Sequence, residues 1–318
     1  MILNFSDFNL LESKGIPNSL IKPSDFIYNF ISDKIDWWVG RKGPANYSEE
    51  FVFSSDEFGF EEDPDFPIKR FKLNLQILLV KYPPNPMITG SAPFYKGSRT
   101  LKNVSWSPGQ LSSDVERGKA IPAMQITINM YGDYKSDVIR IKNNLKALIR
   151  HEMTHLYQNF KANHNRRWAW RNSPISWDLG IIHDYNSNTF FELLNIAYYL
   201  MTRTEFDASL AEVSAGKSGR VDQKKRLINK FLKIDSEKIV GQIRNEMSGD
   251  HDLEEIPLIF LENYERDCKK HKIQPLKWAL KLRNKSFDQF VLAIHDIVKF
   301  KGNLWLKKAS KIEYKTNN

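Results

Sequence analysis

Apolar residues recur along this chain with two different periods. Between Phe71 and Leu79 every second residue is apolar, and the same alternation returns over Met124–Met130, so the pattern predicts two β-strands. The polar residues between the apolar ones of Met124–Met130 are typical of a strand with one exposed face, and we place it at the edge of a sheet. After Ser136-Asp137 the apolar positions instead recur every three or four residues as far as Phe160, which predicts an amphipathic helix of about six turns.

Helical spacing dominates the rest of the chain. Two stretches rich in Pro, Gly and polar residues, 41–67 and 82–119, lack either period and predict irregular structure. The other helices that the spacing predicts run from Pro23-Ser24-Asp25 to Trp38, over Phe190–Met201, from Thr202 onwards, and over most residues beyond 220, ending with Ser286–Phe300 and Leu304–Tyr314.

This order of elements indicates the fold class. Mixed strands and helices come first and helices alone follow, which favours an α+β fold with a mainly helical C-terminal lobe. We divide the chain into an N-terminal helical and irregular segment over 1–67, a catalytic lobe over 68–216 and a basic helical lobe over 217–318. The first of these segments is expected to pack on the second.

Composition narrows the class of protein. The chain has 318 residues, of which 41% are hydrophobic and 27% charged, as in a folded globular protein. Its single cysteine, Cys268, excludes an intrachain disulfide framework and a zinc site built from several cysteines. No apolar run reaches the roughly 18 residues of a membrane span, and Met1–Gly15 lacks a basic start followed by an apolar block. We therefore expect a cytoplasmic protein without a membrane partner.

The formal charge is concentrated at one end. Residues 217–318 hold 23 Lys and Arg against 14 Asp and Glu, an excess that equals the net charge of +9 for the whole chain. A basic segment of this kind can bind an anionic partner such as nucleic acid. Acidic residues are interspersed with the basic ones, however, as in Lys233-Ile-Asp235-Ser-Glu237-Lys238, and this is typical of solvated helix faces.

One motif carries a specific chemistry. The predicted long helix contains His151-Glu152-Met153-Thr154-His155, the HExxH pattern. Histidines four apart project from one face of a helix, so both imidazoles can reach one metal ion. The glutamate between them points in another direction, beside the metal, where it can accept a proton from a bound water.

With this motif, a preceding strand and later helices, the chain resembles the zincin metallopeptidases over roughly residues 68 to 215. The resemblance implies a zincin-like catalytic lobe, one Zn²⁺ per chain bound by His151 and His155, and hydrolysis of peptide bonds by a zinc-activated water with Glu152 as general base. It also implies a peptide or protein substrate, and an extended peptide could pair with the exposed strand Met124–Met130. Arg150 departs from the family pattern, where the residue before the first histidine is usually uncharged.

The third ligand distinguishes subgroups of this family. Metzincins need a glycine and a further histidine where this chain has Gln158 and Lys161, so that subgroup is excluded. Resemblance to the gluzincins, which use a glutamate on a later helix, makes Glu205 the predicted third ligand. Thr202-x-x-Glu205 is also a capping-box pattern, in which Glu205 would bind only the backbone. The alternative ligands that stay open are Asp207, then Glu192, His183 and Glu212.

The residue that orients the first histidine is also unassigned. Some gluzincins place an aspartate for this purpose four residues after the glutamate ligand, and that position is Ser209 here. The supporting contact must therefore come from elsewhere, and we expect it from Asp207.

Two other functions compete with a peptidase. One is a catalytically degenerate zincin fold that serves as a structural component, and compact zincins are similar to proteins encoded by bacteriophages, some carried in virions. The other is a basic nucleic-acid-associated protein in which the two histidines are incidental.

Overall fold

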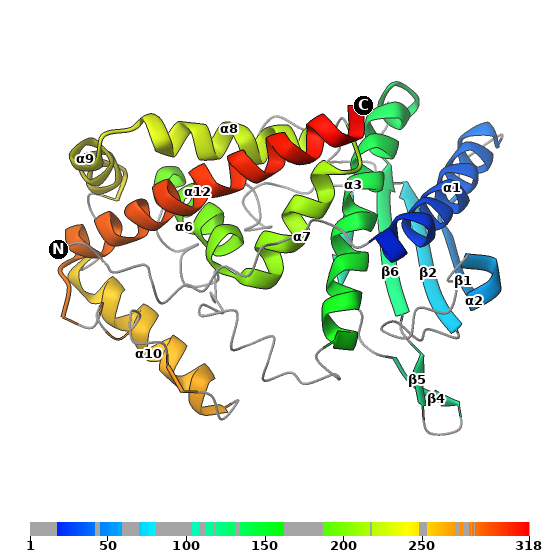
Figure 1. Ribbon diagram of the computed structural model, residues 1–318, viewed down its shortest axis with the longest axis horizontal. Coiled ribbons are helices and arrows are strands. Elements are labelled where there is room, and N and C mark those ends of the chain that lie inside the picture. The colour runs from blue at the N-terminus through cyan, green and yellow to red at the C-terminus, as the bar shows by residue number, and fades with distance from the viewer. Residues whose placement is uncertain are drawn as a thin grey trace. The chain divides into compact units, whose positions relative to one another are not determined.

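The computed structural model of the chain describes residues 18–41, 45–58, 70–79, 104–107, 112–116, 119–121, 123–130, 134–161, 187–216, 218–247, 253–270, 274–275, 280, 282 and 284–317 (Figure 1). These residues fall into two compact units. The sheet unit comprises described residues of Ile16–His164, Ala208–Asp222 and Lys315–Asn318, and the helical unit comprises those of Asn165–Asp207 and Gln223–Tyr314. The division passes within one continuous helix, α7 (Arg203–Val213), whose last six residues belong to the sheet unit.

The sheet unit is built on four strands in the order β1-β2-β6-β3. Its centre is the parallel pair β2 (Arg70–Leu79) and β6 (Ala123–Met130), the two strands that alternation predicts. β1 (Tyr47–Ser54) lies antiparallel to β2, and β3 (Val104–Ser107) lies antiparallel to β6. A separate two-stranded sheet pairs β4 (Ser112–Glu116) with β5 (Lys119–Ile121).

One core joins this sheet to two helices, α1 (Asn18–Gly40) and α3 (Tyr134–Lys161). The alternate side chains Phe71 to Ile77 of β2 and Met124 to Met130 of β6 are buried, and they pack with the apolar stripes of α1 and α3. Figure 1 shows α3 and α1 alongside the sheet. The predicted core faces of both strands are therefore confirmed, and α3 begins two residues before Ser136 and contains the whole HExxH motif.

Two predictions of irregular structure are wrong. Range 41–67 contains β1 and the short helix α2 (Ser55–Phe58), and range 82–119 contains β3, β4 and the first residue of β5. β1 is an edge strand with mostly exposed side chains, so its polar residues hide the alternation. Its apolar face nevertheless packs on α1, because the rings of Phe51 and Phe53 meet that of Phe30 edge to face, with centroids 4.6 and 5.1 Å away.

The predicted start of α1 also needs correction. The helix begins at Asn18, so Pro23 lies inside it and does not open it. Its apolar face is continuous across the proline, with Leu20, Ile27, Ile31 and Ile35 fully buried. Ser24 donates its hydroxyl to the Leu20 carbonyl at 2.5 Å, which satisfies a helical acceptor near the proline.

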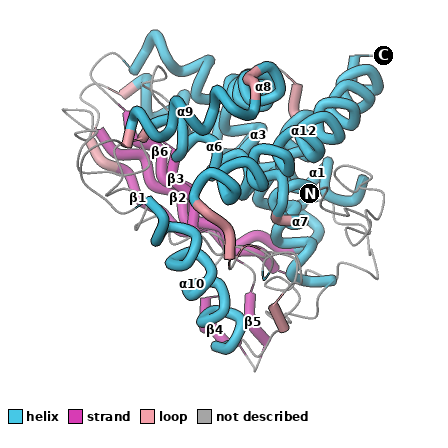
Figure 2. The backbone as a smooth tube through the Cα atoms, turned by 90° about the vertical axis from the view of Figure 1, so that its left-hand side faces the viewer, coloured by secondary structure: helices cyan, strands magenta, loops and turns pink. Residues whose placement is uncertain are grey.

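The described part of the helical unit consists of helices and their connections, whereas the described strands all precede residue 131. Figure 2 shows the helices in cyan and the strands in magenta. An α+β fold is thus confirmed, and the division at residues 67 and 216 stays a prediction. No helix within the described ranges is long and apolar enough to cross a membrane. The described helices that follow α3 are α6 (Asn188–Met201), α7, α8 (Gly219–Lys233), α9 (Ser236–Glu246), the 3₁₀ helix η4 (Leu253–Glu255), α10 (Ile256–Lys270) and α12 (Phe287–Asn317).

α12 is a single helix, although the sequence predicts two helices separated near Gly302. The glycine does not break the helix; it allows α12 to approach α8 closely. A Cβ at Gly302 would lie 2.7 Å from Cγ2 of Ile228 and 3.8 Å from Cδ1 of Leu200. Close packing therefore explains this glycine better than a turn does.

Candidate metal centre

The first four residues of the HExxH motif, and Arg150 before them, are buried in α3. Arg150, His151, Glu152, Met153 and Thr154 are each at most 5% exposed. Charged side chains are costly to bury unless they are paired or bind an ion, so a run of this composition requires specific partners. Thr154 is satisfied within the helix, because its hydroxyl donates to the Arg150 carbonyl at 2.8 Å.

Arg150 is directed away from the two histidines. Its Nη1 donates to the backbone carbonyl and the hydroxyl of Ser214 at 2.9 and 2.8 Å, and its Nη2 pairs with Asp25 of α1 at 3.1 Å. Arg150, the residue that departs from the zincin pattern, is therefore paired inside the protein. Arg150 ties α3 to α1 and to the end of α7 without occupying the space that the imidazoles face.

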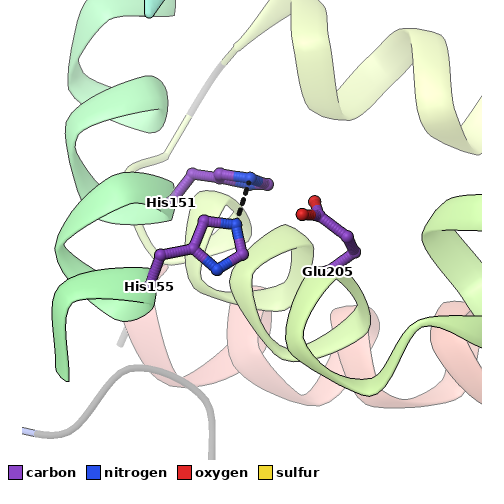
Figure 3. Close-up of side chains that lie close together, drawn as sticks. All are labelled: His151, His155 and Glu205. Carbon is purple, nitrogen blue, oxygen red and sulfur yellow. Dashed lines mark hydrogen bonds between the residues drawn. The ribbon is translucent and has the colours of Figure 1, made fainter. Parts of the chain in front are cut away.

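The two histidines converge as their spacing predicts. Their Nε2 atoms lie 3.1 Å apart, and the rings meet edge to face with centroids separated by 4.7 Å (Figure 3). Two ring nitrogens at this separation either share one hydrogen or face a common cation. Glu152 is close to the same point, since its Oε1 lies 3.9 Å from Nε2 of His151.

Glu205 completes a cluster with these residues. It lies in the first turn of α7, and its carboxylate is directed towards both rings in Figure 3. One ligand atom from each of His151, His155 and Glu205 lies within 4.8 Å of the other two.

Two observations on Thr202 argue against the capping box as the role of Glu205. In that motif the glutamate accepts from the backbone N–H of Thr202, but this N–H donates to the Tyr198 carbonyl at 3.0 Å. The hydroxyl of Thr202 is buried and makes no hydrogen bond to any residue that the structure describes. Burial raises the pKa of the Tyr198 phenol, and the negative charge of the nearby Glu205 raises it further.

The other candidate ligands have different places. Asp207 is not part of the cluster formed by described residues, and Glu192 pairs with Lys230 at 2.5 Å. His183 lies outside the described residues. Glu212 approaches His151 from the opposite side of the ring, at Nδ1.

Glu212 lies at the position beside His151 where the sequence interpretation expects Asp207. Its Oε1 lies 2.8 Å from Nδ1 of His151 and its side chain has no exposed surface. A signal for this position was present: Glu205 and Glu212 are seven residues apart, which puts them two turns apart on one face of α7. The expected role of Asp207 rested on its proximity to Glu205 along the chain, which ignores this helical period.

The donor set suits zinc by its chemistry. Two imidazoles and one carboxylate are a ligand set that catalytic zinc sites use, with a fourth position for water. Ligands about 2.0–2.1 Å from one tetrahedral ion lie about 3.3 Å apart, and the two Nε2 atoms are already 3.1 Å apart. The Glu205 carboxylate needs to approach by at most about 1.5 Å to reach such a spacing.

The prediction that Met124–Met130 forms an edge strand is wrong. Residues Gln125–Ile128 of β6 pair with β3 on one side, while β2 pairs with β6 on the other. β6 is therefore an internal strand along this segment, and β3 stands at the end of the described sheet. The polar side chains of β6 contact neighbouring strands, as in the 3.2 Å hydrogen bond that the Thr127 hydroxyl donates to the Gln76 side chain of β2.

Many charges of the basic C-terminal segment are paired. Arg244 binds both Glu254 and Asp288, at 2.9 and 2.6 Å, and Lys225 pairs with Glu313. These pairs match the interspersed charges seen in the sequence. Nucleic-acid binding by this segment stays a prediction without a described site.

Comparison of the chain with protein-family models, curated proteins and solved structures finds no match. The assignment of a function therefore depends on the residues and on their geometry alone.

Proposed function

We propose that this protein is a zinc-dependent metallopeptidase with a zincin-like catalytic lobe. The observation that carries the proposal is the convergence of two Nε2 atoms at 3.1 Å on the HExxH helix, with the buried Glu152 carboxylate 3.9 Å from one of them. A polar cluster of this kind is expensive inside a core and is expected where a ligand or a reaction requires it.

In this proposal His151, His155 and Glu205 hold one Zn²⁺ per chain. When bound there, zinc would polarise a substrate carbonyl and make a water molecule acidic enough to react near neutral pH. Both histidines come from one helix and Glu205 comes from α7, so the ligands depend on the packing of two helices. Glu212, at Nδ1 of His151, fixes the direction in which the His151 ring presents Nε2.

Glu152 is the general base. It follows His151 in the helix, and its Oε1 lies close to Nε2 of His151 without being one of the clustered ligand atoms. A carboxylate in this position can accept a proton from the attacking water and then deliver it to the departing amine. Its burial keeps bulk water away from the proton that it holds.

The substrate is a peptide or protein in an extended conformation. Since β3 stands at the end of the described sheet order, it replaces β6 as the strand along which such a peptide would add. Backbone hydrogen bonds to an edge strand hold a peptide without reading its side chains, so this edge would contribute affinity and orientation.

Replacement of Glu152 by glutamine tests the proposal. The zinc-loaded wild-type protein should cleave an unstructured protein substrate, whereas Glu152→Gln should bind zinc equally and cleave at least about 100-fold more slowly. Glu262→Gln, the same change at an exposed glutamate of α10, is the matched control and should retain wild-type activity. Wild-type protein that binds zinc but cleaves no peptide bond would instead indicate a structural role for the fold.

A further inference from the structure

We propose that Arg220 is a positioning residue that holds Glu212 against His151 and thereby directs the His151 ring towards the cation. The cation belongs to the proposed function, on which this inference rests. Arg220 acts through Glu212, whose Oε1 lies 3.1 Å from Nη2 of Arg220 and 2.8 Å from Nδ1 of His151.

The backbone places Arg220 independently of the cation. α8 begins beside α3, where the Ser218 hydroxyl donates to Oδ1 of Asn144 at 3.3 Å and accepts from the Arg220 N–H at 3.3 Å. Gly219 makes this approach close, since a Cβ there would lie 3.4 Å from the same Oδ1 atom. Asn144 precedes His151 by seven residues on α3, so the start of α8 is fixed to the helix that carries the histidines.

Charge explains why an arginine is needed at this position. Glu212 has no exposed surface, and a buried carboxylate must be compensated by hydrogen bonds or by an opposite charge. The Arg220 side chain is only 14% exposed and supplies that charge in a fixed direction. Oε1 is held between the guanidinium and the imidazole, so the carboxylate has little freedom to turn away from His151.

The consequence for His151 follows from the chemistry of imidazole. A carboxylate close to Nδ1 favours the tautomer that carries its hydrogen on Nδ1, and this tautomer leaves the other nitrogen, Nε2, available as a lone-pair donor to a metal. Nε2 is the atom that faces His155 here. Arg220, Glu212 and His151 thus form a line of contacts that ends at the proposed cation.

Zinc affinity and the ring tautomer of His151 provide two separate tests. Competition with a chelator should show zinc binding about 10-fold weaker in Arg220→Gln than in the wild type, as expected for a residue behind a ligand. Arg226→Gln, an exposed arginine on the same helix, is the control and should bind zinc as the wild type does. In the zinc-free protein, ¹H–¹⁵N spectra of the histidine rings should show His151 protonated at Nδ1 in the wild type and a mixture of tautomers in Arg220→Gln.

Removal of Arg220 alone leaves a buried carboxylate uncompensated and can prevent folding, so Glu212→Gln is compared with Glu212→Gln/Arg220→Gln. If Arg220 acts through Glu212, these two variants bind zinc equally. A further 10-fold loss in the double variant would overturn the proposal, as would wild-type zinc affinity and an unchanged His151 tautomer in Arg220→Gln. Failure of the wild-type protein to bind zinc would overturn the proposed function, while the tautomer in the zinc-free protein would still decide the role of Arg220.

Discussion

Nε2 of His151 lies 3.1 Å from Nε2 of His155, one turn along the same helix. Glu212 lies on the opposite side of the His151 ring, with its Oε1 2.8 Å from Nδ1. The candidate metal centre therefore depends on how α3, α7 and the start of α8 pack together.

Glu205 is predicted to be the third ligand. Glu205→Gln should weaken zinc binding more than about 100-fold, a larger loss than that expected for a residue behind the ligands. Asp207→Asn removes the same kind of charge two residues away on α7 and should leave the affinity within a few-fold of the wild type. Isothermal titration with zinc measures both variants, and the opposite ranking would transfer the role to Asp207.

Gly302 is predicted to be required for the contact between α12 and α8. Gly302→Ala should lower the free energy of unfolding by about 1–3 kcal/mol, because its Cβ would overlap Cγ2 of Ile228, a branched methyl group close to the backbone. Gly241→Ala in α9 has nothing within 4 Å of the new Cβ and should raise stability by up to about 1 kcal/mol. Denaturant unfolding compares the two, and equal effects would show that α12 and α8 are not closely packed at Gly302.

His295 is predicted to make stability dependent on pH. Its side chain is fully buried in α12, its Nε2 lies 2.8 Å from the Phe231 carbonyl, and burial lowers its pKa. Lys299 lowers this pKa further, whereas the Phe231 carbonyl, Asp296 and Asp235 partly oppose the shift. The unfolded chain then binds a proton more readily than the folded one, so stability falls as the pH drops below the ordinary histidine value of about 6.5.

The variant His295→Gln keeps an N–H donor but does not titrate. Its free energy of unfolding should therefore decrease less between pH 7 and pH 5 than that of the wild type, as measured by urea unfolding at a series of pH values. Identical pH dependence in the two proteins would show that His295 is not held neutral in the core.

Periodicity alone located the elements that carry the candidate centre. β2, β6 and α3 bury continuous apolar faces in one core, so their period is visible without knowledge of the neighbours. The same applies to α6, in which nine of fourteen residues are buried. These elements were predicted because burial on one or more sides dictates their apolar residues.

Elements whose pattern depends on their neighbours were missed. β1 exposes most of its side chains at the sheet edge, and β3 pairs along only four residues, too short a stretch for alternation to be recognised. The sequence predicts that a helix ends at Phe300 and another begins at Leu304, because the closeness of Gly302 to Ile228, a residue 74 positions earlier, is visible only in three dimensions. The orienting role of Glu212 depends in the same way on the packing of α7 against α3.

Zinc retention tests the central claim most directly. After dialysis against metal-free buffer, the zinc-loaded wild-type protein should retain about one zinc per chain by elemental analysis. His151→Ala should retain none, and His164→Ala, which removes a histidine nine residues after the motif, should retain as much as the wild type. Retention of one zinc by His151→Ala, or of none by the wild-type protein, would contradict the metal centre proposed for α3 and α7.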